Sequence, residues 1–209
     1  MPVQLRYETG LTGADYVTRE GWRDARLARC PLHARGGCGF ASHGTYARKW
    51  PPGTLIARWY CPQGHCTFSL LPDHLAARFP GTLAEIEQVV AAVEQARSVE
   101  AAADALRRDP VTLPSAVRWV RRRVTPVRAL LTIVVGLLPQ LLQGCVPTIA
   151  ALRGRLGCAQ VLVSLRALAQ VRLPVLARPL GFQPPSTTGN QRRHRFQHGM
   201  GADPPRGGR

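Results

Sequence analysis

The sequence predicts an α+β protein that is mostly α. Residues 29–72 contain short β-prone runs, TLIARWY (54–60) and TFSLL (67–71), separated by glycine-rich turns. From residue 73 the apolar residues instead recur at helical spacing, and interrupted apolar stretches continue to about residue 180. We therefore expect a small β module followed by helices, in five segments: 1–28, 29–72, 73–125, 126–180 and 181–209.

The charge balance is strongly basic. Twenty-eight basic residues against twelve acidic ones give a formal net charge of +16. This excess is far larger than solubility requires, so a polyanion is the expected partner.

The first segment, residues 1–28, is mixed and polar without a strong period, and is expected to be a lead-in. Its opening residues, MPVQLRYETGLTGADYV, lack an apolar stretch behind a basic start, so a cytoplasmic location is expected. In a reducing compartment, clustered cysteines bind metal more often than they form disulfides.

The second segment, residues 29–72, holds four of the six cysteines in two groups, within CPLHARGGCGFASHG and CPQGHC. Two ligand groups separated by a strand-like run are the layout of a zinc ribbon, in which each group supplies two ligands to one tetrahedral ion. The preferred ligand set consists of four thiols: Cys30, Cys38, Cys61 and Cys66. The main competing set is Cys30, His33, Cys61 and His65, and a degenerate ribbon without metal is the third alternative.

A zinc ion with four protein ligands has no open position for water or substrate. The site is therefore expected to be structural, with the ion supplying folding energy that a segment poor in large apolar side chains lacks.

The third segment, residues 73–125, predicts three helices. Thr82 and Glu85 have the pattern of a capping box, and the helix that starts there is expected to run to about Arg97. Ser98 is expected to cap a second, alanine-rich helix. The third helix, PSAVRWVRRRV, has Pro114 near its first turn, where a missing N–H costs nothing. Two helices followed by an arginine-bearing third helix are the pattern of a helix-turn-helix.

The arginines of the third helix are the predicted DNA contacts. They are Arg118, Arg121, Arg122 and Arg123. No acidic residue occurs between residues 110 and 200, whereas thirteen arginines do, so this half of the chain has the charge of a phosphate-binding surface. Trp119 is interpreted as a core anchor in preference to a base contact.

The fourth segment, residues 126–180, is expected to form an apolar helical extension. Its uncharged part, residues 129–152, is interpreted as short helices broken near Pro139 and Pro147, which pack on each other or form a homo-oligomer. A membrane span over 129–152 is the less favoured alternative, because prolines, glycines and glutamines interrupt it. The fifth segment, residues 181–209, is expected to be a disordered basic tail.

The order of these motifs resembles the N-terminal recognition half of bacterial insertion-sequence transposases and related small orphan proteins. The resemblance covers about residues 28–125 and is carried by HGTYARK (43–49), the Cys61 group with TFSLLP, and the arginine-bearing third helix. It implies a zinc ribbon, a helix-turn-helix and DNA as the partner. One cysteine pair departs from the family's pattern, because Gly64 stands where the second cysteine is expected.

The sequence favours a binding protein over an enzyme. Transposases of that type use three carboxylates that hold divalent metal ions, but after Asp109 the next acidic residue is Asp203, in the predicted tail. We therefore expect a zinc-containing DNA-binding protein related to transposases, without its own catalytic domain. The alternatives are a helix-turn-helix transcriptional regulator, a membrane-associated protein, and an RNA-associated zinc-ribbon protein.

Overall fold

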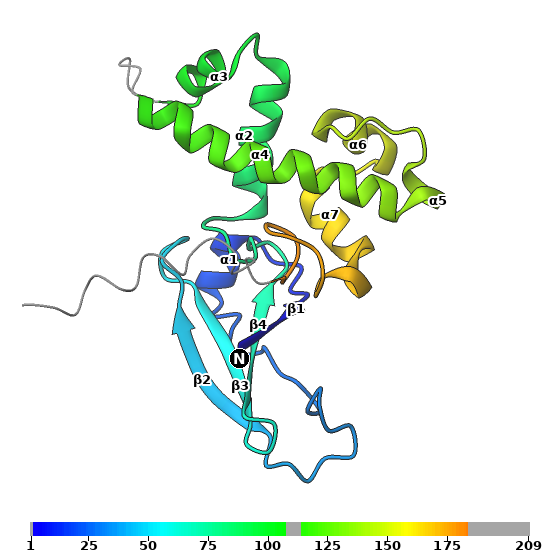
Figure 1. The fold of residues 1–209 in the computed structure, drawn as a ribbon. Helices are drawn as coiled ribbons and strands as arrows, with labels where there is room; N and C mark the ends of the chain where they lie inside the picture. Colours follow the sequence, from blue (N-terminus) through cyan, green and yellow to red (C-terminus); the bar gives the residue numbers. More distant parts are fainter. Residues whose placement is uncertain (1, 108–113, 184–209) are drawn as a thin grey trace, which may run out of the picture.

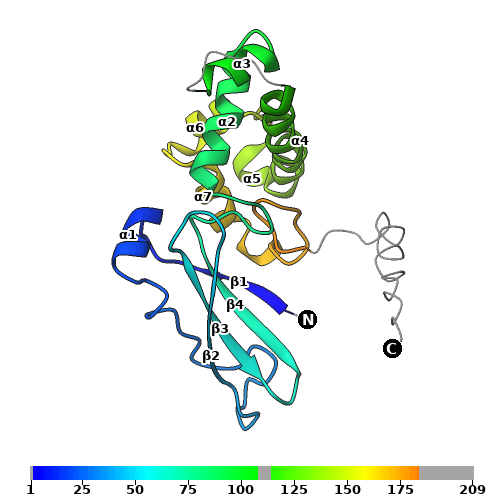
Figure 2. The same cartoon turned by 90° about the vertical axis from the view of Figure 1, so that its left-hand side faces the viewer.

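A computed structural model describes residues 2–107 and 114–183 of the chain. In these residues the fold is mixed, with one four-stranded sheet and seven α-helices, which confirms the α+β class. The helices gather at one end of the sheet, and the loops that carry the cysteines lie at the other end (Figure 1; Figure 2).

The sheet has the strand order β1-β4-β3-β2. Strands β2 (Ala41–Ala47), β3 (Leu55–Cys61) and β4 (Cys66–Pro72) are consecutive antiparallel neighbours. The two expected β-prone runs are thus confirmed as β3 and β4. Their hairpin ends at the pair Cys61 and Cys66, which lie opposite each other in the register.

The segment predicted as a lead-in contains a strand and a helix. Strand β1 (Pro2–Tyr7) pairs in parallel with β4, so that Val3 lies opposite Phe68. Helix α1 (Gly13–Thr18) follows, and its Tyr16 is fully buried. The sequence pattern missed β1 because its pairing partner lies more than sixty residues away and its side chains are mostly half-buried.

The first two predicted helices are confirmed with small shifts at their ends. Helix α2 (Leu83–Gln95) begins with the predicted capping box of Thr82 and Glu85, in which each side chain accepts a hydrogen bond from the other residue's backbone N–H. Helix α3 (Val99–Ala105) begins after Ser98, whose hydroxyl accepts a hydrogen bond from the N–H of Ala101.

Helix α4 (Pro114–Leu137) begins at the expected proline but is much longer than expected. The predicted boundary between residues 125 and 126 falls inside it, because the helix continues through Pro126. A proline inside a helix costs about 3 kcal/mol. Six side chains on one face of α4 are buried, each contributing about 1.5–3 kcal/mol, which outweighs that cost. They are Val120, Val124, Val127, Leu130, Leu131 and Val134.

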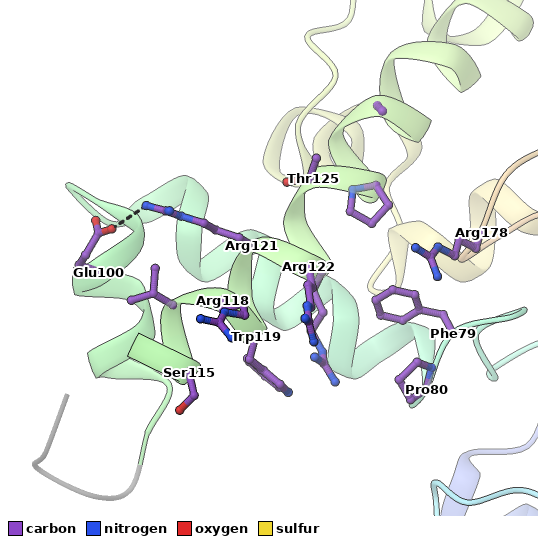
Figure 3. A pocket seen from close by; sticks show the side chains of 14 residues that line it. Phe79, Pro80, Glu100, Ser115, Arg118, Trp119, Arg121, Arg122, Thr125 and Arg178 are labelled. Atoms are coloured by element: carbon purple, nitrogen blue, oxygen red, sulfur yellow. Dashed lines mark hydrogen bonds and ion pairs between the residues drawn. The ribbon is translucent and has the colours of Figure 1, made fainter. Parts of the chain in front are cut away.

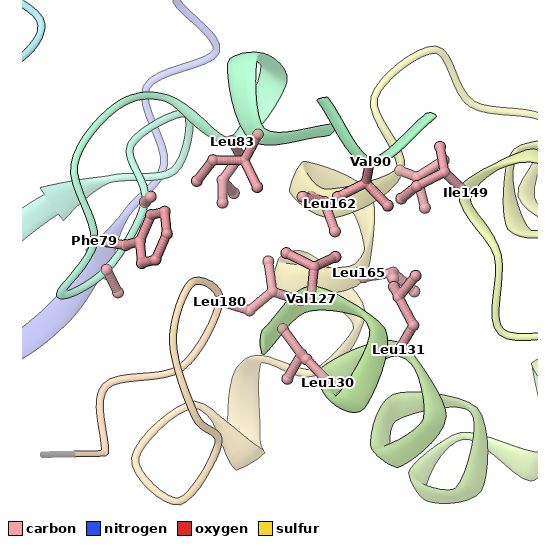
Figure 4. Close-up of a cluster of buried hydrophobic side chains, with 14 of the residues drawn as sticks. Phe79, Leu83, Val90, Val127, Leu130, Leu131, Ile149, Leu162, Leu165 and Leu180 are labelled. Atoms are coloured by element: carbon pink, nitrogen blue, oxygen red, sulfur yellow. The ribbon is translucent and has the colours of Figure 1, made fainter. Parts of the chain in front are cut away.

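The C-terminal segment completes the same core. Helices α5 (Pro139–Leu142), α6 (Ile149–Leu156) and α7 (Val161–Leu168), with the 3₁₀ turn η1 (Gln170–Arg172), follow the breaks predicted near Pro139 and Pro147. Side chains of α2, α4, α6 and α7 meet in one apolar cluster, which Leu180 and Phe182 also join (Figure 4). The disordered tail predicted from residue 181 starts too early, because Phe182 is buried in this cluster, and residues 184–209 of the predicted tail lie outside the described residues.

The stretch interpreted as a less favoured membrane span, residues 129–152, is divided among α4, α5 and α6. Among the helices that the structure describes, none combines the length and the apolar character needed to cross a bilayer.

Candidate metal centre and basic groove

Three cysteines and one histidine gather at the end of the sheet that faces away from the helices. The ligand atoms of Cys30, His33, Cys38 and Cys61 all lie within 4.8 Å of one another. The three thiols are buried and His33 is half-buried. Cys30, His33 and Cys38 come from the loop between α1 and β2, and Cys61 is the last residue of β3.

Two tight turns bring these side chains together. In the first, the N–H of His33 donates to the carbonyl of Cys30 at 3.2 Å, and Gly36 and Gly37, both with positive φ, follow before Cys38. In the second, the N–H of Gly64 donates to Cys61 Sγ at 3.3 Å. A backbone N–H pointing at a thiolate stabilises its negative charge, as metal-binding cysteines require.

The spacing of the donor atoms fits a tetrahedral metal ion. His33 Nδ1 lies 3.5 Å from Cys30 Sγ and 3.3 Å from Cys61 Sγ. A nitrogen and a sulfur ligand bound to one tetrahedral zinc ion are about 3.5 Å apart, given zinc–ligand bonds of about 2.0 and 2.3 Å. Three thiols and one imidazole form a Cys₃His set, which suits zinc and lacks the oxygen ligands that magnesium or calcium prefer.

The structure brings together three of the four preferred ligands, with His33 in the fourth position. Cys66 is buried opposite Cys61 in the hairpin but is not one of the four grouped residues. His65, from the competing set, is exposed. The grouped set therefore combines three members of the four-thiol prediction with the histidine of the alternative. The sequence signal for His33 is its position three residues after Cys30, the usual spacing within one ligand pair.

Gly64 lies directly beside the group. A Cβ atom on Gly64 would lie 2.6 Å from Leu32 Cδ1 and 3.7 Å from the ring of His33. A cysteine at this position would have to displace Leu32, and the imidazole of His33 already lies against the same space.

The ionisation of the thiols is perturbed in opposite directions. Burial opposes the ionisation of Cys30, but hydrogen bonds from His33, Cys61 and the backbone of Leu32 and His33 lower its pKa to about 6. Burial and the neighbouring thiol of Cys30 raise the pKa of Cys38. A cluster in which one thiol ionises easily and its neighbour resists a second negative charge is suited to a cation, which removes the repulsion.

A small apolar core packs around the grouped cysteines, although the sequence predicted a segment that relies on an ion for folding energy. Phe68 is buried against the cysteines, and Leu5, Leu27, Phe40 and Trp59 pack around them. The ring of Phe40 stacks on Trp59 with centroids 5.3 Å apart. Because Leu5 belongs to β1, the segment predicted as a lead-in helps to build this core.

The predicted DNA-contacting arginines lie along one open groove, a cavity of about 1540 Å³ (Figure 3). Arg118, Arg121, Arg122 and Arg123 all line it. Figure 3 shows side chains of α4 on one side of the groove and those of Phe79, Pro80 and Arg178 on the other. Arg118, Arg121 and Arg122 are exposed, and Arg123 is half-buried.

One acidic residue lines the groove, and it is paired. Glu100 of α3 forms an ion pair of 2.9 Å with Arg121. In the described residues 2–107 and 114–183, Arg118 and Arg122 form no ion pair with a carboxylate within 4 Å. The groove therefore keeps an excess of positive charge.

Trp119 is not the core anchor that the sequence predicted. It is 43 % exposed and lines the groove, with the guanidinium of Arg123 stacked 3.8 Å from its ring centroid. The buried positions of this part of α4 are Val120 and Val124 instead. Trp119 directly precedes the buried Val120, so it lies beside the apolar face of α4 and not on it. The predicted helix was too short to define that face.

Two of the arginines in the predicted phosphate-binding surface stabilise the fold instead. Arg166 is fully buried, and its guanidinium donates hydrogen bonds to the carbonyls of Asp73, Leu75, Pro179 and Leu180. Burial lowers the pKa of Arg166 to about 9, so it remains charged at neutral pH. Arg153 pairs with the buried Glu87 at 2.8 Å.

His74 is buried. It is 8 % exposed, and neither ring nitrogen has a hydrogen-bond partner in the described part of the chain. Its ring meets Tyr16 edge-on with centroids 5.4 Å apart. Burial, together with the charges of Arg166 and Arg48, lowers the pKa of His74 to about 4, against the opposing influence of Asp73.

Comparison with protein-family models, curated proteins and solved structures finds no match to this chain.

Proposed function

We propose that this protein binds DNA through the basic groove of α4, and that a zinc ion held by Cys30, His33, Cys38 and Cys61 folds the sheet end of the molecule. The observation that carries the proposal is the gathering of Arg118, Arg121, Arg122 and Arg123 along one open groove whose single lining carboxylate is already paired. Arginine suits phosphate oxygens and guanine edges because of its planar, forked set of donors.

The helical order supports this role. Helices α2, α3 and α4 follow one another as in a helix-turn-helix, and residues 96–98 connect the first two. The connection from α3 to α4 includes residues 108–113, which lie outside the described residues, so the turn before the proposed recognition helix is not described. Val120 on the buried side of α4 and Arg118, Arg121 and Arg122 on the exposed side give the helix the two faces that groove binding requires.

The proposed zinc ion has a structural role. A Cys₃His set uses all four positions of a tetrahedral ion, so it leaves none for a substrate. The ion would join the loop after α1 to the end of β3 and thereby hold that end of the sheet in shape. Transposition is the setting that the sequence resemblance implies, with the chain as a recognition protein that does not cut DNA itself.

The experiment measures DNA affinity as a function of salt concentration. The double variant Arg118→Ala with Arg122→Ala removes two exposed positive charges from the groove, and Arg128→Ala with Arg172→Ala removes two exposed positive charges outside its lining. Each lost phosphate contact lowers the slope of log affinity against log salt by about 0.9. We expect the groove variant to lose about two units of slope and the control variant to keep the wild-type slope.

Two results would contradict the proposal. One is the absence of duplex binding by the zinc-loaded protein at low salt. The other is an equal loss of affinity in both double variants, which would mean that net charge alone, and no particular surface, attracts DNA.

A further inference from the structure

Aromatic and arginine side chains alternate across the basic groove. The guanidinium of Arg123 lies 3.8 Å from the ring centroid of Trp119 and 5.8 Å from that of Phe79. On the far side, the guanidinium of Arg178 lies 5.5 Å from the Phe79 ring. We call these four residues the arginine–aromatic ladder. Its members come from α4, the link between β4 and α2, and the segment after η1.

The ladder leaves one large aromatic surface open. Phe79 is 8 % exposed and so belongs to the core, whereas Trp119 is 43 % exposed. Arg123 covers one face of the indole, and the remainder faces the groove and a neighbouring cavity of about 450 Å³. The exposed Trp50 lines that second cavity. An exposed tryptophan held by a stacked arginine is a rigid, flat platform beside positive charge.

The size of the groove favours a polymer over a small ligand. Small-molecule pockets are usually about 300–1,000 Å³ and enclose most of the ligand. The groove is larger, at about 1540 Å³, and lies open along α4, as Figure 3 shows. Arg122 follows Trp119 by three positions on α4, so their side chains are neighbours on the helix surface, and Arg118 lines the same groove. Phosphates and a stacked planar group could therefore be held together.

Duplex DNA offers little surface for stacking on an exposed indole. Its bases are already stacked on each other and present only their edges in the grooves, so an exposed indole gains little contact. Unpaired nucleotides expose the flat face of each base, and aromatic side chains beside a basic groove are how proteins hold them. The combination of an open indole with flanking arginines therefore matches a single strand.

We propose that the groove binds single-stranded DNA, with a base stacked on Trp119 and the adjoining phosphates held by Arg118 and Arg122. This inference rests on the proposed DNA-binding function and specifies the form of DNA that the site takes. A duplex would be bound through the arginines alone, and more weakly per nucleotide.

The test compares three proteins on two probes. The wild type, Trp119→Leu and Trp119→Phe are titrated with a fluorescent oligothymidylate and with a duplex of the same length. Leucine keeps apolar bulk but removes the aromatic face, and phenylalanine keeps a face. We expect Trp119→Leu to weaken oligothymidylate binding by roughly 5- to 150-fold, the range that corresponds to the loss of one stacked base. Duplex binding should be unchanged, and Trp119→Phe should keep most of the single-strand affinity.

Tryptophan fluorescence supplies a second measurement that does not depend on the leucine variant folding. A stacked base should quench Trp119, so oligothymidylate should quench the wild type more than Trp119→Phe, although both bind. Equal quenching in these two proteins, or equal weakening of both probes by a folded Trp119→Leu, would overturn the single-strand proposal while leaving duplex binding intact. Failure of both probes to bind the wild type would overturn the proposed function as well.

Discussion

Replacement of His74 by leucine should remove a large part of the acid sensitivity of this protein. His74 is buried without a hydrogen-bond partner among the described residues, next to the ring of Tyr16 and near the charges of Asp73, Arg48 and Arg166. At neutral pH, an imidazole in this environment is neutral in the folded state. A leucine of similar size keeps the apolar contact but has no proton to gain.

The size and sign of the effect follow from the pKa. Burial lowers the pKa of His74 from 6.5 to about 4, and in the unfolded chain the pKa returns to about 6.5. Between these two values the unfolded state binds more protons than the folded state, so stability decreases as the pH falls. At 1.36 kcal/mol per pKa unit, the loss between neutral pH and pH 4 is about 3 kcal/mol.

The assay is urea unfolding of the wild type and His74→Leu, both supplied with zinc, at several pH values between 4 and 7. Circular dichroism monitors the unfolding. The free energy of unfolding of the wild type minus that of His74→Leu should fall by about 3 kcal/mol across this range. The subtraction cancels groups that titrate in both proteins, including the thiols of the proposed metal site, whose affinity for zinc falls as the pH falls. A difference that stays constant with pH would refute the reasoning, because it would mean that His74 is solvated or hydrogen-bonded when the protein is folded.

Three further predictions concern the metal ligands, the buried arginine and a helix cap. His33→Ala should lose the zinc that the wild type is expected to bind at one ion per chain, whereas Cys66→Ser should retain it, as measured by metal analysis. Zinc retained by His33→Ala and lost by Cys66→Ser would assign the fourth ligand to Cys66. Arg166→Met should lower the free energy of unfolding by about 3–5 kcal/mol, because four buried carbonyls lose their donor. The exposed control Arg172→Met should change it by less than about 0.5 kcal/mol. Equal effects of the two variants in urea unfolding would contradict the role given to Arg166. Thr82→Ala should cost about 1 kcal/mol in the same assay through loss of the capping box, and an unchanged midpoint would show that α2 does not depend on it.

The proposed metal site shows how far local spacing can lead. Cys30, Cys38 and Cys61 were identifiable from their positions beside glycine-rich turns, and they do lie together. The choice between Cys66 and His33 was not decidable from spacing, because both lie near a ligand in sequence. In the structure, His33 Nδ1 lies 3.5 Å from Cys30 Sγ and 3.3 Å from Cys61 Sγ, and Cys66 is not one of the four grouped residues.

The arginines show what composition alone cannot predict. Composition alone treated the thirteen arginines between residues 110 and 200 as one phosphate-binding surface. The fold divides them, because Arg166 satisfies buried carbonyls and Arg153 pairs with Glu87, whereas Arg118 and Arg122 face the open groove. Charge counts cannot separate these roles, since an arginine inside the core and one on the surface contribute equally to net charge.

By itself the sequence determined the features that depend on neighbours along the chain: the α+β class, strands β3 and β4, the caps of α2 and α3, and the breaks near Pro139 and Pro147. Only the tertiary structure decided the pairing of β1 with β4, the continuation of α4 through Pro126, the grouping of His33 with three thiols and the exposure of Trp119. The physical reason is the range of the interactions. Caps and turns involve residues within about four positions of each other, whereas strand pairing and burial join segments that approach each other only in the folded chain.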